Sequence, residues 1–258
     1  AQHRRSTAPV ALTLPGCPVR GCPKTPMAGT KLTPEGWSGS SKGLWSKRAN
    51  RVIDRKGGIT VAGSELINAL AGNDAITGEQ VKGPGVVVPR NPRRGNLQLG
   101  GDDDTLTGTS KQGIGIDNGG FIFMGDGADT IIGSGADAGI RNRGFIFTQS
   151  GDDQVDVRKG GIRGGGFVDL GADKDTFIGY GNHTVYGGGG RDTILLPKGT
   201  YELLRNNRNR YRLEQGNNEL EIFDFEVVGA INSSKGQRLD IDKGGTLVVK
   251  DNGSISLT

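Results

Sequence analysis

The sequence predicts an all-β chain: a parallel β-helix or β-roll solenoid with a C-terminal β cap and an extended N-terminal tail. Three observations carry this prediction. Glycine accounts for 47 of 258 residues, about 18% against a usual ~7%, without the three-residue period of collagen. Only 33% of residues are hydrophobic, which is thin for a globular core but sufficient for a narrow stacked one. A Gly-Phe-Ile or Gly-Phe-Val step also recurs three times at nearly constant spacing.

The first predicted part is a basic Pro/Gly/Ser-rich tail over residues 1–56. It holds 11 Lys or Arg and 2 Asp or Glu, a net charge of +9, whereas residues 57–258 hold 21 and 26, a net charge of −5; the two sum to the +4 of the whole chain. Such a tail either binds a protein assembly or an acidic polymer, or serves as a solvated arm. Cys17 and Cys22 lie within it and form either a small disulfide or two free thiols.

The second predicted part, residues 57–198, is the glycine-rich solenoid. Residues 115–132 read GIDNGGFIFMGDGADTII, residues 139–155 read GIRNRGFIFTQSGDDQV, and residues 161–178 read GIRGGGFVDLGADKDTFI. The three starting glycines are 24 and 22 residues apart. Short apolar strands separated by glycine turns at this period predict stacked repeats whose equivalent strands lie roughly 4.8 Å apart. Helices are not expected, since no segment keeps an i, i+3, i+4 apolar pattern without a glycine inside it.

The strand FIF, which occurs twice, is apolar on both of its sides. One side is expected to fill the core, and the other needs a cover. The cover is either another part of this chain or a partner protein, and in the second case the phenylalanines form the contact surface. The residues concerned are Phe121, Phe123, Phe145 and Phe147.

The third predicted part, residues 199–258, is the C-terminal β cap. Strand-like stretches alternate here with the turn signals RNNRN, QGNN, DKGG and KDNG. Because the repeat fades in this part, antiparallel or irregular strands are expected to close the stack and to prevent edge-to-edge aggregation.

The turns of the solenoid carry a known nine-residue pattern, G-G-x-G-x-D-x-U-x, in which U is apolar. Residues 187–195, GGGGRDTIL, satisfy it at every fixed place, and residues 124–132, MGDGADTII, depart only at the first. LGADKDTFI (170–178) and LGGDDDTLT (99–107) keep the second glycine, the aspartate and the apolar residue. On these motifs the chain resembles the RTX, or haemolysin-type calcium-binding, repeat family over about residues 70–196.

The resemblance implies that the turns bind Ca²⁺. Calcium takes six to eight hard oxygens, so glycines that turn carbonyl groups inward and aspartates that supply charge suit it. The family's ligand aspartate corresponds to Asp104, Asp129, Asp175 and Asp192, each followed by an apolar residue expected in the core. The candidate calcium residues are Asp104, Asp126, Asp129, Asp173, Asp175, Gly187, Gly189 and Asp192.

The spacing of the motifs departs from the family. Family motifs follow one another every nine residues, whereas the aspartates at 74, 104, 129, 153, 175 and 192 are 30, 25, 24, 22 and 17 residues apart. Residues 171–195 are therefore the best calcium segment. In the longer repeats, aspartates that only accept N–H groups of the turns are the alternative.

A structural or binding role is expected, not an enzymatic one. The chain has two histidines and no nucleophile elbow, Walker loop or dinucleotide fingerprint; a polysaccharide-acting β-helix enzyme is the less favoured reading. The resemblance implies a secreted or cell-surface adhesion protein, and the competing hypothesis is a scaffold subunit of a larger, cytoplasmic assembly. Nucleic acid is not expected as a partner because the basic residues lack interleaved aromatics. A membrane span is not expected either, because the chain has no run of 18 apolar residues.

Overall fold

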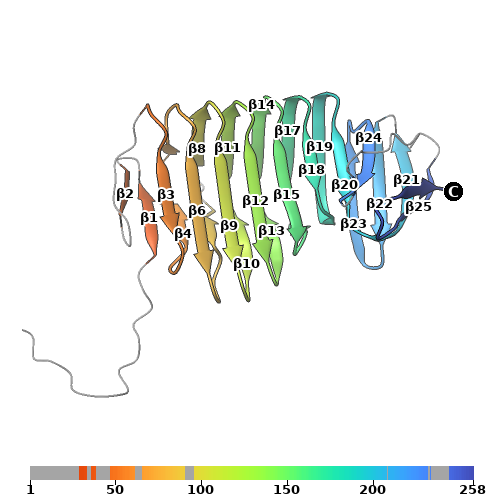
Figure 1. Cartoon of the computed structure of the whole chain (residues 1–258), viewed down its shortest axis with the longest axis horizontal. Helices are drawn as coiled ribbons and strands as arrows, with labels where there is room; N and C mark the ends of the chain where they lie inside the picture. Colours follow the sequence, from red (N-terminus) through yellow and green to blue (C-terminus); the bar gives the residue numbers. More distant parts are fainter. Residues whose placement is uncertain are drawn as a thin grey trace, which may run out of the picture.

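The computed structural model describes residues 29–33, 36–38, 47–61, 66–90, 96–207, 209–231, 233 and 244–258. Within these residues all regular elements are β-strands, so the predicted all-β class is confirmed for this part of the chain. Figure 1 shows equivalent strands side by side in rows along the long axis of the molecule. Most of the predicted basic tail, with Cys17 and Cys22, lies outside the described residues.

Most strands belong to three sets, each of which pairs in parallel from one member to the next. Set A comprises β1 (Thr30–Thr33), β4 (Ile59–Val61), β7 (Val86–Val88), β10 (Ile114–Asn118), β13 (Ala138–Asn142) and β16 (Ile162–Arg163). Set B comprises β3 (Arg51–Asp54), β6 (Ala75–Gln80), β9 (Thr105–Ser110), β12 (Thr130–Gly135), β15 (Gln154–Lys159), β18 (Thr176–Ile178), β20 (Thr193–Leu196) and β24 (Val227–Ala230). Set C comprises β5 (Leu66–Asn68), β8 (Asn96–Gly101), β11 (Phe121–Asp126), β14 (Phe145–Ser150), β17 (Phe167–Asp173) and β23 (Asn218–Phe223), and the last two are joined through β19.

Along the chain the sets recur in the order A, C, B, as in β10, β11 and β12 and then β13, β14 and β15. The long strand β19 (Gly181–Gly190) pairs with β16 at its start and with β17 and β23 further on, so it serves two sets. One strand of each set per repeat, with parallel neighbours, is the arrangement of a β-helix-like stack.

The predicted register is confirmed where the repeat is clearest in the sequence. Phe121 pairs with Phe145 and Phe145 with Phe167, so the three Gly-Phe steps form one column. The parallel pairing begins earlier than residue 57, with β1 and β3, and continues past residue 198, with β23 and β24. These outer strands lack the Gly/Asp turn motif, so the motif alone does not mark where the stack starts and ends.

The core consists of one inward-facing column per set. Burying one such aliphatic side chain contributes about 1.5–3 kcal/mol. The column of set B is at most 1% exposed and contains Val52, Ile76, Leu106, Ile131, Val155, Phe177, Ile194 and Val228. The column of set C is fully buried and contains Ile67, Leu97, Ile122, Ile146, Val168, Val185 and Ile222. The column of set A contains Ile59, Val86, Ile116, Ile140 and Ile162.

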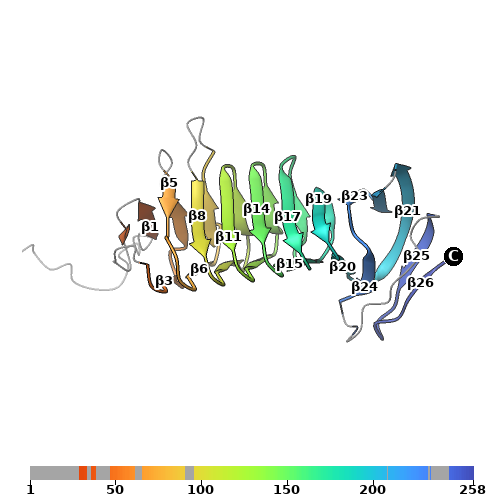
Figure 2. The ribbon, with the colours of Figure 1, turned by 90° about the horizontal axis from the view of Figure 1, so that it is seen from above.

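Antiparallel pairing appears at the C-terminal end, as the loss of the repeat predicts. β21 (Gly199–Asn207) pairs with β22 (Arg210–Gln215) and with β25 (Gly245–Val249), β22 pairs with β23, and β25 pairs with β26 (Ile255–Leu257). Figure 2 shows these strands beyond the last parallel ones, at the end of the molecule that holds the C-terminus. At the other end, β2 (Gly36–Ser38) pairs antiparallel with β1. None of the elements in the described ranges is a helix that could cross a membrane.

Candidate functional site

The turns that lead from set C to set B contain the residues predicted to bind calcium. Each turn has two positions of positive φ with one residue between them, as at Gly125 (φ 123°) and Gly127 (φ 138°) on either side of Asp126. Glycine adopts such angles without steric cost. In the next repeat Gln149 (φ 85°) takes the first of these positions, so a residue with a side chain is accommodated there. The paired bends change the direction of the chain between sets C and B, and the aspartate that ends the motif lies in the interior.

Six aspartates, one per repeat, form a column at the end of these turns. All are at most 1% exposed. We name this column the aspartate ladder; it consists of Asp74, Asp104, Asp129, Asp153, Asp175 and Asp192.

Each ladder carboxyl accepts a hydrogen bond from the backbone of the preceding repeat. The N–H of Asp104 donates to Oδ1 of Asp129 at 2.8 Å, and the N–H of Asp129 donates to Oδ1 of Asp153 at 2.7 Å. The same bond recurs at every step from Asp74 to Asp192. The carboxyls therefore satisfy buried N–H groups that would otherwise cost about 1–3 kcal/mol each.

The ladder is terminated at both ends by other oxygen-bearing side chains. At the first repeat the N–H of Asn50 donates to Oδ1 of Asp74 at 2.5 Å, and Asn50 Nδ2 donates to the same oxygen at 2.9 Å. At the last repeat the N–H of Asp192 donates to Oε2 of Glu226 at 2.7 Å. Neither end residue belongs to the nine-residue motif, and the sequence offered no signal for them apart from their place before a strand.

The second carboxyl oxygen, Oδ2, of every ladder residue is buried without a hydrogen-bond partner. In the last turn it faces Gly187, because a Cβ atom at Gly187 would lie 2.6 Å from Oδ2 of Asp192. The same inward position, five residues before the aspartate, holds other buried residues in the earlier turns: Ala69, Leu99, Met124, Thr148 and Leu170. The Thr148 hydroxyl donates to the Leu170 carbonyl at 2.5 Å, and the polar contact of this side chain with Asp153 lowers the pKa of that carboxyl in part.

Burial is the largest influence on the pKa values of the ladder aspartates. It raises the pKa of Asp74, Asp153 and Asp192 from 3.8 to about 6. It raises the pKa of Asp104 and Asp129 to about 7, and that of Asp175 to about 8. The N–H bond to each carboxyl lowers the pKa in part, whereas neighbouring aspartates raise it further. Desolvation thus disfavours the charged form throughout the column.

The residues predicted to bind calcium are divided between the interior and the surface. Asp104, Asp129, Asp175 and Asp192 belong to the ladder, and Gly187 is buried beside Asp192. Three others lie on the outer side of the turns. Asp126 is exposed and accepts a hydrogen bond from the Ser150 hydroxyl, Asp173 is exposed with φ 87°, and a Cβ at Gly189 would meet no atom within 4 Å.

The ladder carboxyls do not by themselves complete a calcium site. A calcium ion needs six to eight oxygens, whereas Oδ1 of each ladder carboxyl is occupied by an N–H group and Oδ2 faces the inward column of mostly apolar residues. In the described part of the chain, no three or more His, Cys, Asp or Glu side chains converge as a metal-holding group. The observed hydrogen bonds correspond to the alternative predicted for the longer repeats, in which the aspartates accept N–H groups of the turns.

The predicted aromatic surface lies on the outer face of set C. Ile122 and Ile146 point into the core, while the phenylalanines beside them point outward and stack on one another. The ring centroids of Phe121 and Phe145 are 4.8 Å apart, and those of Phe123 and Phe147 are 5.2 Å apart, with interplanar angles of 11° and 10°. The rings therefore cover much of each other, and Phe145 remains 41% exposed.

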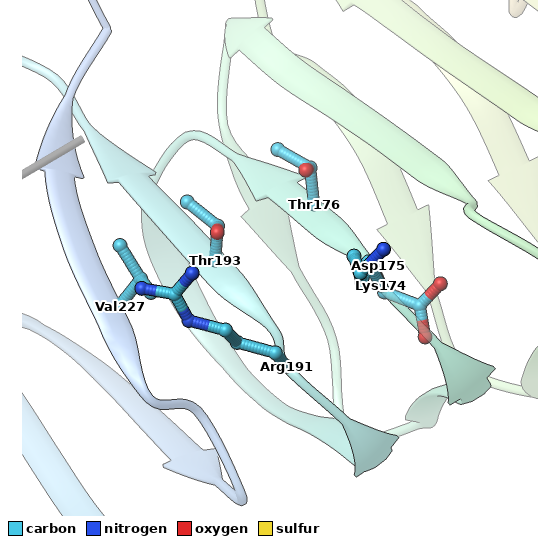
Figure 3. A pocket seen from close by; sticks show the side chains of 6 residues that line it. All are labelled: Lys174, Asp175, Thr176, Arg191, Thr193 and Val227. Atoms are coloured by element: carbon cyan, nitrogen blue, oxygen red, sulfur yellow. The ribbon is translucent and has the colours of Figure 1, made fainter. Parts of the chain in front are cut away.

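A shallow pocket lies on the outer side of set B, next to the last ladder residues. Figure 3 shows its lining, which comprises Lys174, Asp175, Thr176, Arg191, Thr193 and Val227. The Arg191 side chain extends toward Val227, whereas the Asp175 carboxyl group points the opposite way (Figure 3). The pocket therefore presents the cations of Lys174 and Arg191 and the hydroxyl groups of Thr176 and Thr193.

No protein-family model matches the chain, and neither a curated protein nor a solved structure is found to match it. The resemblance to RTX repeats thus stays a prediction carried by the turn motifs alone.

Proposed function

We propose that the protein is a non-catalytic structural β-solenoid, a rigid rod that serves as a scaffold. The observation that carries this proposal is the parallel register of set B, which continues through every repeat from β3 to β24. A stack of this kind gains stability repeat by repeat and presents long, regular surfaces. Residues 1–56 and the stacked phenylalanines stay the predicted contacts with an assembly.

We assign the antiparallel strands β21, β22, β25 and β26 the role of the C-terminal cap. The last parallel strand of a stack exposes unpaired N–H and C=O groups, which would template aggregation with another copy. β22 continues from β23 by antiparallel pairing, so it occupies that edge of set C. Leu203, Tyr211 and Leu213 of these strands are buried and belong to the same core cluster as the columns.

The second candidate is a calcium-stabilised adhesion protein, secreted or at the cell surface. The specific observation in its favour is the complete nine-residue motif at 187–195. This turn also differs from the others because it has a glycine, Gly187, beside Asp192, where the earlier turns have a side chain. The ladder geometry speaks for the first candidate, because the carboxyls already have backbone donors.

A chelator comparison separates the two candidates. We expect the far-UV circular dichroism and the urea midpoint of the full chain to be the same in calcium and in EDTA at one fixed pH. The reason is that the ladder holds the turns together without an ion. Loss of β signal in EDTA, restored by calcium but not by magnesium, would favour the adhesion protein. Solution scattering in both buffers provides the control, because a solenoid of either kind gives an elongated particle.

A further inference from the structure

The last two turns between sets C and B carry cations where the earlier turns carry acidic or neutral residues. The position directly before each ladder aspartate holds, in chain order, Asn73, Asp103, Ala128, Asp152, Lys174 and Arg191. Lys174 and Arg191 are exposed, and neither forms an ion pair with another described residue. Both line the pocket on the outer side of set B. The charge of this position therefore reverses where the pocket lies.

The acids at this position have a structural role that cations cannot take over. Oδ1 of Asp152 accepts the N–H of Lys174 at 3.1 Å, and Asp103 forms the same bond to the turn that follows it. Lysine and arginine side chains have no acceptor atom. The N–H of Arg191 donates instead to the Asp173 carbonyl, at 3.3 Å. The hydrogen bonding of the turns thus does not explain the two cations.

Two threonine hydroxyl groups face the same pocket. Thr176 and Thr193 pair in register on β18 and β20, and parallel neighbours lie roughly 5 Å apart. Their side chains have the same orientation on the neighbouring strands (Figure 3). Neither hydroxyl group bonds to another residue in the described part of the chain. The two threonines therefore present two further donors beside the cations.

The lining suits an anion with several oxygens. Arginine presents a fork of N–H donors, lysine a compact charge with three donors, and each threonine one O–H group. Asp175 also lines the pocket, but its carboxyl group points the opposite way (Figure 3). The pocket volume is about 280 Å³, against roughly 30 Å³ for one water molecule. There is room for an anion of four oxygens and for part of a group that carries it.

We propose that this pocket binds a tetrahedral oxyanion, a sulfate or phosphate group, between the two cations and the two threonine hydroxyl groups. Charged N–H and O–H donors form strong hydrogen bonds to such oxygens. This binding site goes beyond the scaffold role and depends only on the last two turns. The group belongs either to a free ion or to a polymer that carries it, and the test separates these sources.

An earlier pair of repeats provides a comparison within the same chain. Thr105 and Thr130 form the same hydroxyl pair on β9 and β12. The residues that precede the ladder aspartates of their turns are Asp103 and Ala128, so no cation accompanies them there. Thr130→Val is therefore the matched control for Thr193→Val.

The test is a titration of the ¹⁵N-labelled full-length chain with sodium sulfate and with sodium phosphate, followed by NMR. EDTA is present, and sodium chloride keeps the ionic strength constant. We expect the amide signals of the four polar lining residues named in the proposal to shift together and to give one dissociation constant. Acetate should bind more weakly, because a carboxylate offers two oxygens to these four groups.

Substitutions separate a formed site from general attraction of anions. The double variant Lys174→Gln, Arg191→Gln should weaken sulfate binding by at least about tenfold, and Thr193→Val by about tenfold at unchanged charge. Thr130→Val should leave the dissociation constant as in the wild type. Lys82→Gln with Lys111→Gln removes two positive charges at exposed positions outside the pocket. Equal weakening in this control, or pocket signals that move with neither ion, would overturn the proposal.

Polymers identify the source of the group. If dextran sulfate or polyphosphate moves the same pocket signals and the Lys174→Gln, Arg191→Gln variant abolishes the effect, the bound group belongs to a polymer. If only the inorganic ions move them, the ligand is a free ion. A polymer that moves only signals elsewhere, such as those of residues 1–56, while inorganic ions have no effect, would refute the pocket. An elongated particle in solution scattering would then still support the scaffold role.

Discussion

Phe177→Ala is expected to cost about 3–5 kcal/mol of unfolding free energy. Phe177 lies in β18 with its side chain fully buried, between Val155 and Ile194 in the inward column of set B. Removing the ring leaves a cavity that adjacent repeats cannot fill, because hydrogen bonds on both sides fix their strands. Urea unfolding at constant pH measures the loss as a lower midpoint with an unchanged denaturant slope.

Phe147→Ala is the matched control for this prediction. It removes the same ring from the outer face of set C, where Phe147 is half-buried and stacks on Phe123 at 5.2 Å. Loss of an aromatic pair on a surface costs about 1 kcal/mol. Equal losses in the two variants would contradict the assignment of inner and outer faces, and a larger loss in Phe147→Ala would indicate that another chain covers these rings.

The contrast between these two phenylalanines marks how far the sequence predicts the fold. The recurring Gly-Phe steps predicted that Phe121, Phe145 and Phe167 share a column, and the pairing confirms it. The apolar residue after each motif aspartate was predicted to enter the core, and Leu106, Ile131, Phe177 and Ile194 do so. Both predictions depend on local period and alternation, which the chain carries in every repeat.

The strands at either end of the stack could not be predicted in this way. β3 and β24 join set B in register, yet neither follows a Gly/Asp turn of the repeating kind. Their place depends on hydrogen bonds offered by the neighbouring repeat, which is a long-range effect. A segment without the motif forms parallel pairs because the edge strand of the neighbouring repeat lies next to it. The sequence of the segment alone does not reveal that edge strand.

The role of the aspartates could not be predicted from the motif either. The pattern predicts that an aspartate ends the turn, but the group that lies beside its carboxyl depends on the residue five positions earlier. In the complete motif this residue is glycine, as at Gly187, and in the other turns of the motif it is larger, as at Leu99, Met124 and Leu170. A side chain there fills the space beside the carboxyl with carbon atoms instead of backbone oxygens. The longer repeats thus keep the aspartate as a hydrogen-bond acceptor, and the calcium prediction rests on the motif of the last turn.

Gly133→Val carries the second large expected effect, a loss of about 3 kcal/mol through overpacking. Gly133 shares a column with Gly78 and Gly108 in set B, where the chain turns toward set A. A Cβ atom at Gly133 would lie 2.4 Å from Cγ1 of Ile140 and 2.5 Å from the Gly139 carbonyl oxygen. The first neighbour is a core side chain and the second is backbone, so neither can move without displacing a paired strand.

The matched control is Gly165→Val, because a Cβ atom at Gly165 would meet nothing within 4 Å. We expect a change within about 0.5 kcal/mol there, as for most exposed positions. Thermal and urea unfolding of both variants, with Gly133→Ala as an intermediate, measure whether the cost grows with side-chain volume. A flat series at Gly133 would mean that sets A and B are further apart than described. A graded series would show that glycine at this column sets the close approach of sets A and B.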